Sequence, residues 1–377
     1  MTPRVVVAGA LANKPGNGGE AWVRTTWVRG LERLGIDVRF VEVLSGAAWG
    51  DAAPACVEWS TRTLRRFGIA ERSVLVDADD GGLIAGPRRV LEELHEGADL
   101  LVNISGHLRS GPVFERCRRR AYVDLDPAYT QIWHDQGADL GIAEHDSHFS
   151  VGLNLGRPGC TVPLGDTHWQ AVLPPVLLDE WTPDPGDELG RFTTVASWRG
   201  GYGVLEHDGV RYGSKAHEFR RFTALPGPVG APLELALDIH PADERDRCLL
   251  LGHGWRLVDP AEAVGDPDRY RAYLRGSGAE LSVAQGAYVQ TRSGWFSDRT
   301  AHYLAAGRPV LVQDTGASLP ASDGLRFFTS TDDAARGAAE LRARYGEHRA
   351  GARRFAEEHL DAARVLGRFL EQAGVGR

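Results

Sequence analysis

The stretch from Ser293 to Gly316, SGWFSDRTAHYLAAGRPVLVQDTG, contains residue types that could bind a phosphate. A short helix is predicted over about Asp298–Ala306, because Ser297 is a favoured N-cap residue. The N-terminus of a helix offers free backbone N–H groups and a partial positive charge, which suit a phosphate or diphosphate. The hydroxyls of Ser297 and Thr300 add donors, and Gly294 allows close approach of the backbone. The simpler alternative is that Ser297 only caps a structural helix.

Candidate acid–base groups follow two strands that are predicted in the first half of the chain. His107 comes after the apolar run Leu100–Ile104, and Asp124 and Asp126 end the next run. A strand end in a parallel sheet faces the ligand crevice, so these side chains would lie there. An imidazole or carboxylate could deprotonate a hydroxyl group or bind one. The alternatives are a surface histidine at position 107 and an aspartate at 126 that forms a turn before Pro127.

Two other patterns suggest cofactor or metal chemistry without matching it. Gly16, Gly18 and Gly19 follow the first predicted strand, but they do not fit G-x-G-x-x-G, and no suitably placed acid follows the second strand. This counts against a nicotinamide dehydrogenase. The residues EHDSHF, at positions 144–149, invite a metal hypothesis, but the spacing of His145, Asp146 and His148 matches no strong zinc signature. No metal and no resident cofactor are therefore expected.

Strands and helices are predicted to alternate along the chain, which indicates a parallel α/β sheet. The apolar spacing predicts a helix over about Glu20–Leu34 and a strand over Asp37–Leu44. A proline-rich segment, LPPVLLDEWTPDPGDELG, then interrupts the pattern before a second α/β series. The further predicted strands are Val5–Ala8, Val74–Val76, Leu100–Ile104, Ala121–Leu125, Phe192–Ser197, Leu233–Ile239, Cys248–Leu251, Glu280–Val283 and Pro309–Gln313, and the closing helices are Thr331–Arg344 and Arg349–Gln372.

We therefore expect two Rossmann-like domains that face each other across a cleft, which is the default ligand site. The first would cover residues 1–185 and the second 186–345, with a helical segment over 346–377 that could pack back on the first domain.

The composition excludes several classes of partner. A formal charge of −8 and a pI of about 5.9 count against nucleic acid. No apolar run is long enough for a membrane span, and no signal peptide opens the chain. The four cysteines are far apart, which fits a reducing compartment and a cytoplasmic protein.

The sequence AAGRPVLV, at Ala305–Val312, together with the turn and helix before it, resembles the donor-binding region of glycosyltransferases of the GT-B fold. The resemblance is closest to bacterial glycosyltransferases of the group 1 type, found in natural-product and cell-surface pathways. It touches most of the chain, but only residues 293–316 are specific. It implies that the second domain binds a nucleotide-diphosphate sugar and that the first binds a small-molecule or surface-glycan acceptor. The implied donor-binding residues are Gly294, Ser297, Asp298, Arg299, Thr300 and His302.

The resemblance also implies transfer without a metal, in which a side-chain cation and a helix terminus stabilise the leaving diphosphate. Lys215, one of only two lysines, is the candidate for that cation, and the alternative is a solvated lysine. The GNGG loop would face the donor phosphates or the acceptor across the cleft. His253 and Trp255 are weak candidates for contact with the nucleobase.

One departure from the family pattern concerns the stereochemistry. Many retaining members carry Glu-x7-Glu, whereas Gly294 and His302 occupy those two positions here. Inversion and retention both stay open, and His302 either donates a hydrogen bond to the ribose or packs between the domains. The expected function is transfer of a sugar from a nucleotide sugar to a hydroxyl group. The alternatives are a nucleotide-sugar epimerase of the same fold and a non-catalytic two-lobed binding protein.

Overall fold

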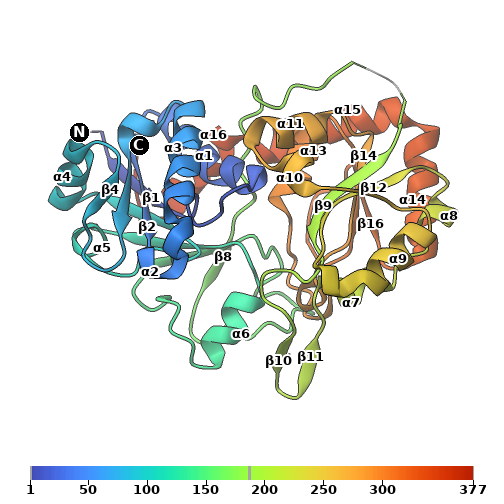
Figure 1. The fold of residues 1–377 in the computed structure, drawn as a ribbon, viewed down its shortest axis with the longest axis horizontal. Coiled ribbons are helices and arrows are strands. Elements are labelled where there is room, and N and C mark those ends of the chain that lie inside the picture. The colour runs from blue at the N-terminus through green and yellow to red at the C-terminus, as the bar shows by residue number, and fades with distance from the viewer. Residues whose placement is uncertain (1, 186–187, 377) are drawn as a thin grey trace.

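The computed structural model describes residues 2–185 and 188–376, which form two α/β lobes (Figure 1). In this part of the chain, the first lobe has an eight-stranded sheet with the order β4-β3-β2-β1-β5-β6-β7-β8. Its strands are parallel except at the β3–β4 pair. The strands are β1 (Arg4–Ala8), β2 (Asp37–Leu44), β3 (Ser73–Asp77), β4 (Leu83–Ala85), β5 (Leu100–Ile104), β6 (Arg120–Asp124), β7 (Ser147–Ser150) and β8 (Trp169–Ala171), and the helices are α1 (Gly18–Arg33), α2 (Gly46–Trp49), α3 (Ala53–Arg66), α4 (Arg88–Glu96), α5 (Pro112–Glu115) and α6 (Tyr129–Asp135).

The second lobe has a six-stranded parallel sheet with the order β13-β12-β9-β14-β15-β16. Its strands are β9 (Phe192–Ser197), β12 (Leu233–Asp238), β13 (Arg256–Val258), β14 (Ala279–Ser282), β15 (Val310–Gln313) and β16 (Leu325–Phe328). Its helices are α7 (Lys215–Arg220), α8 (Pro226–Val229), α9 (Glu244–Gly252), α10 (Pro260–Val264), α11 (Pro267–Arg275), α12 (Gly286–Gln290), α13 (Asp298–Ala305), α14 (Thr331–Ala343) and α15 (Tyr345–Phe355). The fold therefore consists of two Rossmann-like domains, as the alternating pattern predicts.

The proline-rich segment between the lobes is packed rather than loose. Trp181 is fully buried, and its ring lies 5.1 Å from that of Trp22. The Val176 N–H donates to Leu360 O at 2.8 Å, and the Ala362 N–H donates to Val176 O at 2.9 Å. These bonds attach the segment to the start of the last helix, α16 (Ala362–Gln372). The linker is thus part of the core that joins the lobes.

Helix α16 crosses back and packs on α1 of the first lobe (Figure 1). The rings of Trp27 and Phe369 meet at 4.9 Å in an edge-to-face arrangement. A Cβ atom at Gly30 would lie 2.4 Å from a methyl carbon of Leu366, so the absence of a side chain lets the two helices approach. One hydrophobic cluster consequently runs from β1 through α1 to the second lobe.

A two-stranded hairpin from the second lobe, β10 (Leu205–His207) and β11 (Val210–Tyr212), reaches helix α6 of the first (Figure 1). Just before it, the Tyr202 ring lies 5.0 Å from both the Tyr129 and the Trp133 rings. At its turn, His207 Nε2 lies 2.7 Å from the Asp135 carboxylate. The hairpin therefore connects the two lobes at a second place, far from the linker.

Two predictions about single elements are wrong. Cys248–Leu251 belongs to helix α9 rather than to a strand, because a short apolar run does not distinguish the two. Leu250 is buried while Leu249 and Leu251 are exposed, which fits the surface position of this helix. The predicted closing helix over Arg349–Gln372 is broken at Asp361, whose carboxylate caps α16 after the π-turn Ala356–Leu360.

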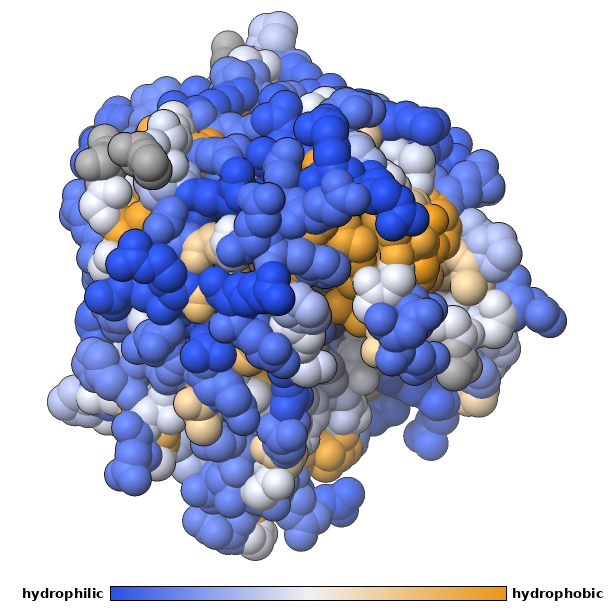
Figure 2. All heavy atoms as spheres, turned by 90° about the vertical axis from the view of Figure 1, so that its left-hand side faces the viewer, coloured by the Kyte–Doolittle hydropathy of each residue, from blue (hydrophilic) through white to orange (hydrophobic). Residues whose placement is uncertain are grey.

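Hydrophilic side chains cover most of the outer face of the first lobe, with one apolar patch (Figure 2). Within residues 2–185 and 188–376, no helix is both long and apolar enough to cross a bilayer.

Candidate functional site

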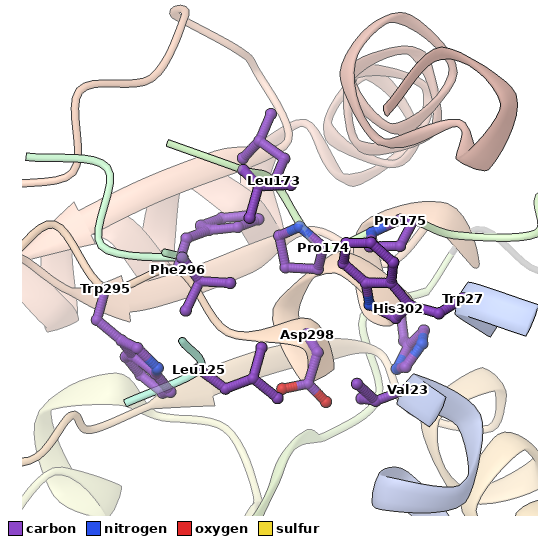
Figure 3. A pocket seen from close by; sticks show the side chains of 12 residues that line it. Val23, Trp27, Leu125, Leu173, Pro174, Pro175, Trp295, Phe296, Asp298 and His302 are labelled. Atoms are coloured by element: carbon purple, nitrogen blue, oxygen red, sulfur yellow. The ribbon is translucent and has the colours of Figure 1, made fainter. Parts of the chain in front are cut away.

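A narrow pocket lies between the two lobes, at the ends of strands β6, β7 and β8 (Figure 3). Val23 and Trp27 of α1 line one side, and Trp295 and Phe296 of the second lobe line another. Its other lining residues are Leu125, Val151, Val172, Leu173, Pro174, Pro175, Asp298 and His302. Figure 3 shows the Asp298 carboxylate directed into this mostly apolar pocket. The cleft between the domains is thus formed where the sequence places it.

The start of helix α13 lies at this pocket. Ser297 caps the helix, since its hydroxyl accepts the Arg299 N–H at 3.2 Å, and Thr300 is buried. Burial, together with the Glu20 carboxylate, raises the pKa of the neighbouring Asp298 carboxyl to about 6. A proton can therefore reside on Asp298 near neutral pH, which reduces its repulsion of an anion at the helix start.

Gly294 has a role that the sequence does not reveal. Its φ is +76°, and a Cβ atom there would lie 2.4 Å from the Asn154 nitrogen. Its carbonyl accepts the Leu153 N–H at 3.0 Å. Gly294 therefore lets the second lobe dock closely on the first.

Arg299 is committed to the sheet of the second lobe. Its guanidinium donates to Glu280 Oε1 at 2.8 Å, to Val195 O at 2.8 Å and to Ser282 Oγ at 2.6 Å. These partners lie on β9 and β14. Arg299 thus fixes helix α13 against the strand ends, and each of its three nitrogen atoms already donates one hydrogen bond.

His302 packs between the domains. Its ring stacks on Trp181 with the centroids 4.3 Å apart, and its Nδ1 lies 3.2 Å from the Tyr270 hydroxyl. Burial lowers the pKa of His302 to about 3, so the imidazole is neutral at physiological pH.

Lys215 is a buried cation at the end of strand β14. Its Nζ donates to Val283 O at 3.0 Å and lies 6.0 Å from the centre of the Trp295 ring. Burial, together with the charge of Arg299, lowers the pKa of Lys215 to about 7. The solvated-lysine alternative does not apply, because only 8% of the residue is exposed. The ammonium group still has donor capacity beyond its single backbone acceptor.

The three acid–base candidates of the first lobe differ in their surroundings. Asp124 is fully buried and accepts from Thr130 Oγ1 at 2.6 Å, from Ser150 Oγ at 2.7 Å and from Gln131 Nε2 at 3.0 Å. A carboxylate so fully bonded is a structural anchor. Burial, together with the charges of Arg24 and Lys14, lowers the pKa of His107 to about 4. His107 is therefore a weak base at neutral pH.

Asp126 lies between the lobes. Its Oδ1 accepts from the Tyr288 hydroxyl at 2.8 Å, and its Oδ2 accepts from the Tyr202 hydroxyl at 2.9 Å. Burial, together with the nearby Asp124 carboxylate, raises the pKa of Asp126 to about 6. A carboxyl with a pKa near the operating pH is well suited to act as a base, and each oxygen keeps a lone pair free.

The loop after β1 binds an anion that belongs to the chain itself. Both oxygens of buried Glu42 accept backbone N–H groups: Oε1 from Leu11 at 2.7 Å and Asn13 at 2.9 Å, and Oε2 from Ala12 at 2.7 Å. Backbone N–H groups at this position bind the pyrophosphate in a dinucleotide-binding domain. Here a carboxylate occupies them, which is a further reason against a nicotinamide cofactor in the first lobe.

The three glycines of this loop differ in environment. Gly16 has a φ of +72° and open space around it. A Cβ at Gly18 would lie 2.3 Å from Asp266 O, and one at Gly19 would lie 3.1 Å from the Tyr270 ring. The loop thus ends in direct contact with the second lobe.

The weaker candidates are dispersed. His145 Nδ1 lies 2.6 Å from Gly141 O and its Nε2 lies 3.1 Å from Asn103, while Asp146 accepts the Arg120 N–H. In the described ranges, no three His, Cys, Asp or Glu residues are grouped to hold a metal ion. The two candidates for contact with the nucleobase follow helix α9, where His253 is exposed and Trp255 is buried.

The roles of five further residues could not be predicted from the sequence. Glu20 and Arg24 lie four residues apart on α1, a spacing that indicates an ion pair but does not place it at the cleft. In the sequence, nothing distinguishes Glu42 from the other residues of its strand. Tyr202 and Tyr288 lie 76 and 162 residues from Asp126 along the chain, so no local pattern connects them.

Comparison with known proteins gives a fold but no close relative. No family model matches the sequence, and no curated protein matches it. The Anabaena protein HepE, solved in complex with UDP and glucose, has a similar structure: the TM-score is 0.58 at 10% identity, with 99% of both chains covered. A glycosyltransferase from Rickettsia africae gives 0.55 at 11% identity, with 99% of this chain and 98% of that chain covered.

The pneumococcal O-GlcNAc transferase GtfA, solved with UDP and GlcNAc, gives a TM-score of 0.55 at 8% identity, with 99% of both chains covered. These matches extend over both lobes. The chain therefore has the two-domain GT-B fold.

Proposed function

We propose that this protein is a glycosyltransferase that moves a sugar from a nucleotide-diphosphate sugar to a hydroxyl-bearing acceptor. The main support is the arrangement of the cleft: a buried lysine and a helix start on the second lobe lie across from a carboxylate with a raised pKa on the first. HepE and GtfA, which share the fold, were solved with UDP and a sugar. An acceptor from natural-product or surface-glycan synthesis, a cytoplasmic location and metal independence belong to the same proposal.

The donor would bind the second lobe. Lys215 would place its ammonium group against the diphosphate, and the start of α13 at Ser297 and Thr300 would direct its dipole to the same group. Asp298 would lie beside them. Arg299 would act by fixing the helix, and His302 by filling the space between the domains.

The acceptor would bind the first lobe. In an inverting transfer, Asp126 would take the proton from the acceptor hydroxyl as the oxygen attacks the anomeric carbon, and the nucleoside diphosphate would leave. We prefer Asp126 to His107 for this role because its pKa lies nearer to neutral pH. Asp124 would hold the strand end in place.

A first experiment measures binding of UDP, GDP and dTDP by calorimetry without added metal. Binding of at least one is expected. A second incubates the matching nucleotide sugars with candidate acceptors and with no acceptor. A glycosylated acceptor supports the proposal, whereas a changed sugar in the absence of acceptor would identify an epimerase. If a folded sample binds no nucleotide, the proposal fails.

A further inference from the structure

Arg24 is a buried arginine with two nitrogen atoms that lack a hydrogen-bond acceptor. It lies on α1, and 3% of the residue is exposed. Its Nε and Nη1 atoms have no hydrogen-bond acceptor in the described chain. Glu20 Oε2 lies 2.7 Å from Nη1, but the pair is not aligned as a hydrogen bond. Leaving buried donors unpaired is unfavourable, so these two atoms are open to a partner from outside.

The local backbone is shaped to hold this side chain. A Cβ atom at Gly9 would lie 3.2 Å from Arg24 Cδ and 3.4 Å from Nε. Gly9 follows strand β1 directly, so the guanidinium stem lies against the end of the central strand of the first sheet. An alanine at position 9 would press on the stem and shift it.

Arg24 also lies near groups from both lobes. It contributes to lowering the pKa of His107 in the first lobe, after burial, and it opposes the burial-driven rise in the pKa of Asp298 in the second. Glu20 also affects both residues, and Lys14 affects His107. Val23 and Trp27 of the same helix line the pocket between the lobes, so Arg24 lies on the helix that borders the cleft.

We propose that Arg24 binds the diphosphate of the nucleotide donor from the side of the first lobe, opposite Lys215. This rests on the proposed function. A guanidinium group makes charge-assisted hydrogen bonds to phosphate oxygens, and the Nε–H of Arg24 is free to donate one. Closure of the cleft on the donor would bring the diphosphate to both cations. Glu20 would keep Arg24 oriented while the site is empty.

The test compares nucleoside diphosphate with nucleoside monophosphate binding. UDP, GDP and dTDP are titrated into the wild-type protein, and the tightest of them is used with its monophosphate against Arg24→Gln and Arg24→Lys. We expect Arg24→Gln to weaken the diphosphate by about 10- to 100-fold and the monophosphate by clearly less. Arg24→Lys should recover part of this loss, because it keeps the charge without the paired donors.

The matched control is Arg29→Gln on the same helix. Arg29 pairs with Glu180 at 2.6 Å on the linker, so its loss should not change the preference for diphosphate. Thermal unfolding checks that each variant is folded. If Arg24→Gln does not fold, Gly9→Ala tests the same point by displacing the guanidinium, with a smaller loss of the same preference expected.

An unchanged preference for diphosphate in folded Arg24 variants would overturn this inference and leave the proposed function intact. If the wild-type protein binds none of the three diphosphates, the proposed function itself fails.

Discussion

The Tyr288 hydroxyl of the second lobe donates a 2.8 Å hydrogen bond to the Asp126 carboxylate of the first. This bond crosses the boundary between the domains at the residue that we propose as the catalytic base. The pKa of Asp126 therefore depends on how the lobes sit, because two tyrosines from the opposite lobe stabilise its charged form. These two hydroxyls therefore couple the relative position of the two lobes to the pKa of Asp126.

The first prediction concerns Asp126→Asn. Since an amide cannot accept the acceptor's proton, turnover should fall by about 100- to 10,000-fold while nucleotide binding is retained. The pH–rate profile of the wild-type enzyme should lose activity as the pH falls below about 6, where Asp126 becomes protonated. His107→Ala serves as the comparison, and if it removes that acidic limb while Asp126→Asn does not, His107 is the base.

The same substitution should change the pH dependence of stability. The folded-state pKa of Asp126 is raised to about 6, above its ordinary value of 3.8, so the folded protein binds more protons in this interval. Its contribution to the free energy of unfolding is therefore present below about pH 4 and is lost as the pH rises towards 6. Chemical denaturation should show a shallower decline over this range in Asp126→Asn. An identical decline would mean that Asp126 titrates normally.

A second prediction concerns proton uptake by Lys215. With a pKa of about 7, about nine-tenths of this lysine is neutral at pH 8, and a bound diphosphate would restore its charge. Calorimetry of nucleotide binding at pH 8 in two buffers of different ionisation enthalpy should show uptake of close to one proton. Lys215→Arg should abolish the uptake, because arginine stays protonated. Lys215→Ala should weaken binding by about 1.5–3 kcal/mol.

Exposed Lys14 provides the control for that experiment, since Lys14→Ala should leave the uptake unchanged. Equal heats in both buffers for the wild-type protein would exclude protonation of Lys215 on binding.

A third prediction concerns the anchor under the glycine loop. Glu42→Gln keeps the size of the side chain but replaces one acceptor oxygen with an NH2 group that faces the Ala12 N–H. We expect the free energy of unfolding to fall by about 1–3 kcal/mol, because a buried donor loses its partner. Glu93→Gln, which removes a half-buried carboxylate from an ion pair with Arg39 on the outer side of the same sheet, should cost less. Equal losses in the free energy of unfolding of the two variants would show that Glu42 is not a special anchor of this loop.

The sequence predicts those features that depend on residues close together in the chain. It does not predict contacts between residues that are far apart in the chain. The periodicity of Asp37–Leu44 and Phe192–Ser197 predicts strands with those bounds, because burial in a parallel sheet is a local pattern. The run Cys248–Leu251 misleads, because four residues fit a helix as well as a strand.

The candidate site is harder to predict from the sequence, because contacts between distant residues decide the roles of its side chains. The segment 293–316 identifies the helix start, yet Gly294 serves domain docking and Arg299 serves the sheet. Contacts with Leu153 and Glu280 decide these roles, and only the folded chain brings them together. Arg24 stays hidden because its surroundings come from both lobes.

The last prediction uses the hairpin to test whether domain contact tunes the base. Tyr202 precedes β10, is 41% exposed and donates to Asp126 Oδ2 at 2.9 Å. This bond stabilises the carboxylate and holds the pKa of Asp126 below the value that burial alone would impose. Tyr202→Phe keeps the ring that packs on Tyr129 and removes only the hydroxyl donor. The pKa of Asp126 should then rise, so the acidic limb of the pH–rate profile should move to higher pH, while turnover on the plateau above it changes little.

Tyr212→Phe, on the same hairpin but outside this bond, is the matched control and should leave the limb in place. A limb that stays fixed in Tyr202→Phe, with the fold intact, would show that the hairpin does not influence the base.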